Sequence, residues 1–177
     1  MQDIRRRIAD EARQLVSTGS DATRLARPPG DQGLVPEGSV AWQVHGDFAT
    51  MIVGGVAALL MQMLHPAALA GVWDHSNFRK DSLGRLRRTA QYIAGTTFGS
   101  TATAGALVAQ VRRIHDRVHG TLPDGTAYSA NDPALLTFVH VAGADSFLAA
   151  YMRYRAPLGL ADQIGRASCR ERVCSTV

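Results

Sequence analysis

The sequence predicts an all-α fold of about six helices. Of its 177 residues, 46% are hydrophobic and 19% are charged, a balance typical of one folded domain with a core. Apolar residues recur every three to four positions over several long stretches, as on one face of a helix. Only 6% of the residues are aromatic and alanine is frequent, which favours helix over strand.

The N-terminal part, residues 1–35, is predicted to form a helix and an arm. Apolar residues spaced four apart indicate an amphipathic helix near the start of the chain: Ile4, Ile8, Ala12 and Val16. Residues 17–37 are rich in proline, glycine and polar side chains, so we expect a loop that leads into the core. The charged N-terminus has no apolar segment like that of a secretory signal, and we expect the protein in the cytoplasm.

A run without any charge, Phe48–Leu64, is predicted to be the central helix. Its 17 residues only just reach the length of a membrane span, and Gln62 and two adjacent glycines weaken that alternative. We therefore expect a buried core helix and no stable membrane span. Its small residues would let a neighbouring helix or a flat ligand come close: Gly54, Gly55, Ala57 and Ala58.

Four more helices are expected after this run. They span about Pro66–Trp73, Leu83–Ala94, Thr101–Val118 and Pro133–Tyr154. Asp81 or Ser82 is a suitable N-cap for the second, and Asn131 or Asp132 for the fourth. Glycines indicate a break at Gly95–Gly99, and Asp124-Gly125 indicates a short hairpin within Gly120–Tyr128.

The last fourteen residues, Ile164–Val177, are interpreted as a non-native tail. Their sequence, IGRASCRERVCSTV, has no apolar period. Back-translated as atc gga aga gcg tcg tgt agg gaa aga gtg, it matches the read-through of a common sequencing adapter. A natural basic tail is the alternative. We expect the natural protein to continue beyond Gln163, so that the helical domain of residues 36–163 is incomplete at its C-terminus.

Excluding this tail narrows the classes of function. Both cysteines, Cys169 and Cys174, lie in it, so the rest of the chain offers no disulfide and no cysteine-based zinc site. The tail also holds three arginines and one glutamate, so the net charge falls from +4 to +2 without it. That charge is too small to indicate a nucleic-acid partner. Hydrolase and phosphate-binding glycine motifs are missing from the sequence as well.

Two histidines near the end of the third of these helices are candidate metal ligands. His115 and His119 are four apart and would share one helical face. The sequence between them, HDRVH, lacks the glutamate that zinc proteases carry beside the first histidine. One histidine from such a helix can instead ligate a haem iron. The alternative is a pair of half-exposed histidines on an arginine-rich face.

A second cluster presents guanidinium and hydroxyl groups together. Arg85, Arg88 and Thr89 share a helix with Tyr92, and such a face can hold a carboxylate, a haem propionate or bound dioxygen. The alternative is a solvated basic face. Polar residues just upstream, Asp74–Asn77, favour convergence of these groups, although their own roles stay unassigned. His65 and His140 are better interpreted as core histidines whose hydrogen bonds are satisfied.

Three motifs together resemble a known family. They are LLMQMLHPAALAGVWDHSNFRKDSLGRLRRTAQYIAGTTFG, VRRIHDRVHG and DGTAYSANDPALLTFVHVAGADSFLAAYMRY. Their order and spacing, over about Trp42–Tyr154, are similar to those of the bacterial MpaB-like oxygenases, which share a catalytic domain with rubber oxygenases (latex-clearing proteins). The resemblance implies a globin-like helical domain that holds a b-type haem through one proximal histidine.

The resemblance also assigns residues. His115 matches the histidine of the family pattern V-R-x-x-H-x-x-V and would be the axial iron ligand, with His119 as the second choice. Arg85, Arg88 and Thr89 match the distal pattern R-x-x-K-T, with arginine at the lysine position. No counterpart is found for the glutamate proposed as a base in the rubber oxygenases, and the C-terminal helices are missing.

The expected function is that of an oxidoreductase, a haem-dependent oxygenase. Its partners would be dioxygen and a small apolar substrate such as an isoprenoid, with Arg85 and Thr89 polarising dioxygen or anchoring haem. The alternative is a helical protein that binds a lipid-like ligand or haem without catalysis.

Overall fold

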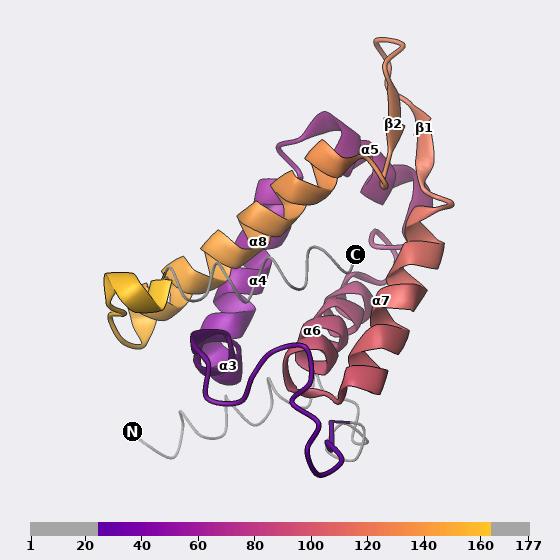
Figure 1. Cartoon of the computed structure of the whole chain (residues 1–177). Coiled ribbons are helices and arrows are strands. Elements are labelled where there is room, and N and C mark those ends of the chain that lie inside the picture. Colours follow the sequence, from indigo (N-terminus) through magenta and orange to yellow (C-terminus); the bar gives the residue numbers. More distant parts are fainter. Residues whose placement is uncertain (1–24, 164–177) are drawn as a thin grey trace.

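The protein is described by a computed structural model over residues 25–163, which form a helical domain with one small hairpin (Figure 1). The predicted helix of residues 4–16 and the tail of residues 164–177 lie outside the described residues. Within them the all-α prediction is confirmed.

The elements follow one another with short connections. In chain order they are α3 (Val40–Gly46), α4 (Phe48–Gln62), α5 (Pro66–His75), α6 (Ser82–Phe98), α7 (Thr101–His115), β1 (His119–Thr121), β2 (Ala127–Ser129) and α8 (Pro133–Tyr154). The starts of α5, α6, α7 and α8 confirm the predicted helices to within a residue. The antiparallel β1–β2 pair confirms the predicted hairpin.

Two expectations about the elements were wrong, and one helix was not predicted. Helix α6 does not break at Gly95 but continues to Phe98. Helix α7 ends at His115, and Val118 instead donates to the His115 carbonyl in a turn (3.0 Å). The short helix α3 was not foreseen. Ser39 caps it by accepting a weak hydrogen bond from the Trp42 backbone N–H (3.4 Å).

Helices α4 and α8 lie side by side along much of their length (Figure 1). Gly54 makes this possible, because a Cβ at this position would lie 2.8 Å from the Cα of Phe147. The expected close approach of a neighbouring helix is therefore confirmed. The expectation of a fully buried helix is wrong, since α4 packs along one side and exposes a row of apolar side chains: Val53, Val56, Leu60 and Met61.

Helices α6 and α7 form a second pair that meets at a corner, Gly99–Ser100 (Figure 1). Gly95 lies against Leu107 of α7, where a Cβ would overlap the leucine side chain. The glycine that predicted a break is thus required by the crossing of the two helices. Ser100 caps α7 by accepting a hydrogen bond from the Thr103 N–H (3.1 Å).

The arm before α3, residues 25–39, is hydrogen-bonded to this corner. The Arg27 side chain donates to the carbonyl oxygens of Thr97 (2.8 Å), Phe98 (3.0 Å) and Gly99 (3.0 Å), at the C-terminal end of α6. Asp31 accepts from both the N–H (2.9 Å) and the hydroxyl (2.6 Å) of Thr101, at the N-terminal end of α7. The predicted loop therefore satisfies backbone groups that helix ends leave unpaired.

The hairpin is held against α5. The Tyr128 hydroxyl donates to the Asp74 carboxylate (3.0 Å), and His75 Nε2 donates to the His119 carbonyl oxygen (3.1 Å). Two of the polar residues that had no role in the sequence, Asp74 and His75, thus attach the hairpin that follows α7.

One described helix, α8, is long and apolar enough to span a membrane, and α3 with α4 would be a second candidate despite a 92° bend between them. Core helices of water-soluble proteins meet the same requirement of length and composition. The expectation of no stable span therefore stays a prediction.

Candidate functional site

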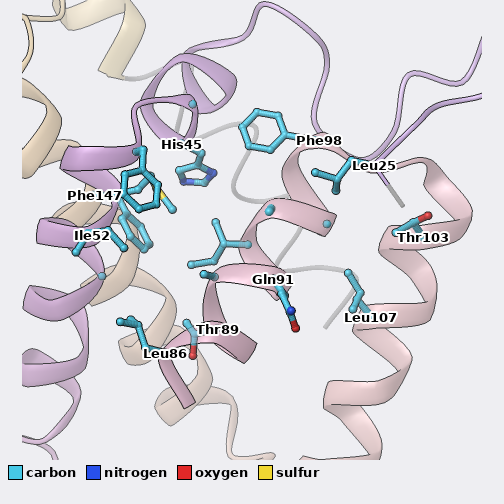
Figure 2. Close-up of a pocket in the computed structure, with 18 of the residues that line it drawn as sticks. Leu25, His45, Ile52, Leu86, Thr89, Gln91, Phe98, Thr103, Leu107 and Phe147 are labelled. Carbon is cyan, nitrogen blue, oxygen red and sulfur yellow. The ribbon is translucent and has the colours of Figure 1, made fainter. Parts of the chain in front are cut away.

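A cavity of about 690 Å³ lies between α3–α4 on one side and α6–α7 on the other (Figure 2). Phe147 of α8 and Leu25 of the arm complete its wall. The volume falls in the range of about 300–1,000 Å³ that is usual for small-molecule sites. Helix crossings at two glycines, Gly54 and Gly95, set the positions of the two helix pairs that enclose it.

The wall of this cavity is mainly apolar. Its large apolar side chains are Phe48, Met51, Ile52, Leu86, Ile93, Phe98, Leu107 and Phe147. Its polar side chains are His45, Thr89, Gln91, Thr103 and Gln110. Among the described lining residues His45 is the one histidine, and no aspartate, glutamate, lysine or arginine is present. Such a wall suits an apolar molecule with few hydrogen-bonding groups.

His45, which no motif of the sequence indicated, is fixed at one end of the cavity. Its Nδ1 lies 2.8 Å from the hydroxyl oxygen of Thr97, a residue only 2% exposed. Its ring meets the ring of Phe147 edge-on, with centroids 5.4 Å apart. Figure 2 shows His45 between Phe147 and Phe98, and Thr89 beside Leu86 at the opposite end.

The predicted distal residues are placed differently from one another. Thr89 lines the cavity, and its hydroxyl donates to the Arg85 carbonyl oxygen (3.1 Å). Arg85 is half-buried, and burial and then the charge of Arg88 lower the pKa of its guanidinium. No acceptor for this guanidinium is found among residues 25–163. Arg88 is exposed and lies 3.4 Å from the Asp81 carboxylate.

The predicted proximal histidine stands apart from the cavity wall. His115 is the last residue of α7 and is half-buried. Burial lowers the pKa of His115, while the charge of Asp116 acts in the opposite direction. Burial therefore favours the neutral imidazole, the form that binds a metal.

The second choice, His119, is exposed and belongs to β1, so the predicted helical pairing of the two histidines is wrong. Helix α6 ends and helix α7 begins at the same corner, Gly99–Ser100 (Figure 1). Arg85 lies near the other end of α6 and His115 at the other end of α7, so both are remote from this corner. The described residues contain no group of three histidine, cysteine, aspartate or glutamate side chains that could hold a metal ion.

The two histidines expected in the core are both half-buried. The ring of His65 packs on Phe138 with centroids 5.1 Å apart, but its Nδ1 is buried without a hydrogen-bond partner among the described residues. His65 therefore packs on an aromatic ring at a half-buried position, and the expectation that its hydrogen bonds are satisfied is wrong for Nδ1 among the described residues.

Comparison with known families gives a match over most of the chain. The family model described as "ER-bound oxygenase mpaB/B'/Rubber oxygenase, catalytic domain" matches residues 42–167. Helices α4 to α8 lie wholly within that range. Comparisons with curated proteins and with solved structures gave no match. The family suggested by the motifs is thus confirmed.

Proposed function

The chain belongs to the family of the ER-bound oxygenase mpaB/B' and rubber oxygenase catalytic domain, and from this premise we propose that it is a haem-dependent oxygenase with an apolar substrate. The family makes it an oxygenase, and hence an oxidoreductase. The observation that carries the finer proposal is the position of Thr89. It belongs to the R-x-x-R-T motif and lines the apolar cavity.

The side chains remote from the α6–α7 corner have the chemistry that a haem needs. A haem held through a histidine requires the neutral imidazole, and the burial of His115 favours that form. It also carries two propionates, for which the half-buried guanidinium of Arg85 is a suitable partner. We therefore propose that His115 would hold the iron and Arg85 a propionate. The bound group would supply the activation of dioxygen.

The cavity would bind the substrate. Binding of an apolar molecule is favoured by about 25 cal/mol for each Å² of apolar surface removed from water. Because the described wall has no permanently charged side chain, no ionic group has to lose its water when the molecule binds. Thr89 follows Arg85 by four residues, one helical turn. Its hydroxyl would contact a ligand at the end of the cavity nearest Arg85.

The absorption spectrum of the purified chain tests the haem proposal. We expect a Soret band that is lost in His115→Ala and kept in His119→Ala, the matched control, since His119 is an exposed strand residue. Cooperative thermal unfolding of both variants must accompany the spectra. A wild-type protein that stays colourless after reconstitution with haem would contradict the proposal.

One observation favours the alternative of a lipid- or haem-binding protein without catalysis. No carboxylate is among the described residues that line the cavity, so no side chain there matches the base expected in rubber oxygenases. Dioxygen consumption by the haem-loaded protein with squalene, an isoprenoid hydrocarbon, separates the two. Binding of squalene without consumption of dioxygen supports the alternative.

A further inference from the structure

Positive charge is concentrated at one end of the described domain. Residues 73–117 carry eight lysines and arginines and three aspartates, a net charge of +5, whereas the other described residues carry a net charge of −4. All eight basic residues lie within residues 79–88, around the start of α6, or residues 112–117, around the end of α7. The hydrogen bond from His75 to the His119 carbonyl oxygen joins the two segments through the end of α5 (Figure 1). Residues 73–88 and 112–117 are called the basic end below.

The connection between α5 and α6 presents aromatic and basic side chains together. Trp73 is 47% exposed and packs on Phe78, with ring centroids 5.7 Å apart. The Arg79 guanidinium lies over the indole of Trp73, 4.6 Å from its centroid. Arg79 and Lys80 are both exposed, and neither forms an ion pair with a carboxylate among residues 25–163. Their positive charges therefore face water without a local counter-charge.

The two aspartates of the same segment are occupied by the protein itself. The Asp74 carboxylate accepts a hydrogen bond from the Tyr128 hydroxyl (3.0 Å). The Asp81 carboxylate accepts from the Gly84 N–H (2.8 Å) and lies 3.4 Å from Arg88. Neither carboxylate is directed at Arg79 or Lys80, so the segment offers its positive charge to a partner from outside the domain.

An anionic surface that also accepts apolar groups fits the basic end better than a nucleic acid does. Large apolar side chains are exposed there as well, Leu83 by 38% and Ile114 by 52%. Bases stack on open aromatic faces, but Arg79 covers one face of Trp73 and Phe78 packs on the same ring. In a lipid layer the indole lies at the level of the headgroups, arginine and lysine contact anionic headgroups, and apolar side chains enter the acyl region.

We propose that the basic end binds the surface of a membrane that contains anionic lipids. Trp73 and Phe78 lie in the headgroup layer, and Arg79 and Lys80 contact the negative headgroups. This inference goes beyond the proposed function, because it assigns a docking surface outside the cavity and requires no membrane span. It also brings the cavity close to lipid, since Leu86, which lines the cavity, follows Leu83 by three residues on α6. An apolar substrate dissolved in the lipid would then be close to its binding site.

Sedimentation with vesicles tests the proposal on the whole chain, without haem or dioxygen. The probes are vesicles of phosphatidylcholine alone and vesicles in which part of this lipid is replaced by phosphatidylserine. We expect binding to the anionic vesicles only, and loss of this binding when salt is raised from about 0.1 M to about 1 M, because salt screens exposed charges. Equal binding to both kinds of vesicle, or binding to neither, would overturn the proposal.

A pair of matched double variants locates the surface. Arg79→Gln/Lys80→Gln should weaken binding to the anionic vesicles about 25-fold, about fivefold for each charge. Arg153→Gln/Arg155→Gln removes the same charge at the far end of α8, remote from the basic end, and should change binding less than about twofold (Figure 1). Equal losses in the two double variants would show that net charge alone acts, and the assignment to the basic end would be wrong.

The apolar contribution separates a lipid surface from a polynucleotide. Trp73→Ser should weaken vesicle binding about tenfold, because the indole no longer leaves water. Cooperative thermal unfolding must be retained, and Leu83→Ser, at a second exposed position, replaces this variant if it does not fold. A chain that binds a labelled single-stranded oligonucleotide and no vesicles would overturn the proposal. A colourless protein would overturn the proposed function and leave the vesicle measurement intact.

Discussion

The two ends of α6 are held in different ways. At the C-terminal end, Thr97 is 2% exposed, and Arg27 binds three successive carbonyl oxygens. At the N-terminal end, Leu83 is 38% exposed, and the first turn is capped by the exposed carboxylate of Asp81, which accepts from the Gly84 N–H (2.8 Å). One helix thus has an end fixed by tertiary contacts and an end that borders solvent.

This difference between the two ends indicates where the fold can accept a ligand. The fixed end pairs its polar groups with the protein itself, so the cavity has a constant shape near His45. The open end carries Arg85, a half-buried cation without an acceptor among the described residues. Partial burial of a charge costs free energy unless a partner offsets it, and an anionic group of a cofactor or substrate would supply that partner.

Replacing Arg27 should have the largest effect on the fixed end. Arg27→Met keeps the length of the side chain but leaves the carbonyls of Thr97, Phe98 and Gly99 without a donor. We expect the free energy of unfolding to fall by about 3 kcal/mol, because several charged hydrogen bonds are lost together. Urea unfolding measures it. Arg27→Lys is the control for charge, and full stability in the lysine variant would show that the planar fork is unnecessary.

A methyl group at Gly33 should be the next most damaging change. Gly33 has a φ of +62°, and its Cβ would lie 2.5 Å from an Arg27 nitrogen and 2.7 Å from the Gly99 carbonyl oxygen. We expect Gly33→Ala to cost about 2 kcal/mol or more by urea unfolding. Gly30→Ala is the matched control. Its φ is +85° and nothing lies within 4 Å, so it carries the backbone cost alone. Equal costs would mean that the close contact is relieved.

Much of the chain could be predicted because the decisive contacts are local. Asp81 caps α6 through the N–H of Gly84, three residues later, and Asp132 with Pro133 starts α8 in the same way. Asp124-Gly125 forms the hairpin turn, in which Gly125 has a φ of +89°. In each case the sequence within a few residues determines the structure.

The rest depended on contacts between distant residues. His45 became a site candidate only through Thr97, 52 positions away, and the carbonyl oxygens at the end of α6 that Arg27 binds are 70 to 72 positions from it. A glycine such as Gly95 often marks the end of a helix. Here its contact with Leu107 requires a glycine inside the helix. Apolar periodicity shows which faces of a helix can be buried but not how many other helices cover them. The exposed apolar face of α4 could therefore not be predicted from the sequence.

Low pH should lower the stability of the α6–α7 corner by protonating Asp31. Hydrogen bonds from the Thr101 hydroxyl, the Gly33 N–H and the Thr101 N–H lower the pKa of Asp31 below its usual 3.8. The folded state therefore binds this proton more weakly than the unfolded chain. The contribution of Asp31 is complete above that value and is lost as the pH falls through the lower pKa of the folded state.

We expect Asp31→Asn to be less stable than the wild type at pH 7, and the gap in urea unfolding to shrink as the pH is lowered from about 5 to about 2. Asp124→Asn is the comparison: bonds within its own hairpin turn also lower the pKa of Asp124, so its gap should shrink over the same pH range without involving the corner. Asp31 would have no such role if the gap were the same at every pH.

The smallest effect on stability is expected from an arginine at the open end. Arg88 lies 3.4 Å from Asp81, and the two side chains are 62% and 47% exposed. Exposed pairs of this kind contribute about 0–1 kcal/mol, so Arg88→Ala should change the free energy of unfolding by less than about 0.5 kcal/mol, and less still in high salt. Asp81→Asn keeps the cap and removes the charge, so it should behave similarly.

The same variant should lower activity if Arg88 has the role that we predict from its match to the lysine position of the distal motif R-x-x-K-T. We expect Arg88→Ala to keep its Soret band and consume dioxygen more slowly, whereas Arg27→Met loses stability first. A large loss of stability in Arg88→Ala would show that the protein also fixes this end of α6. Unchanged stability and unchanged dioxygen consumption would remove Arg88 from the site and leave Arg85 and Thr89 as its distal residues.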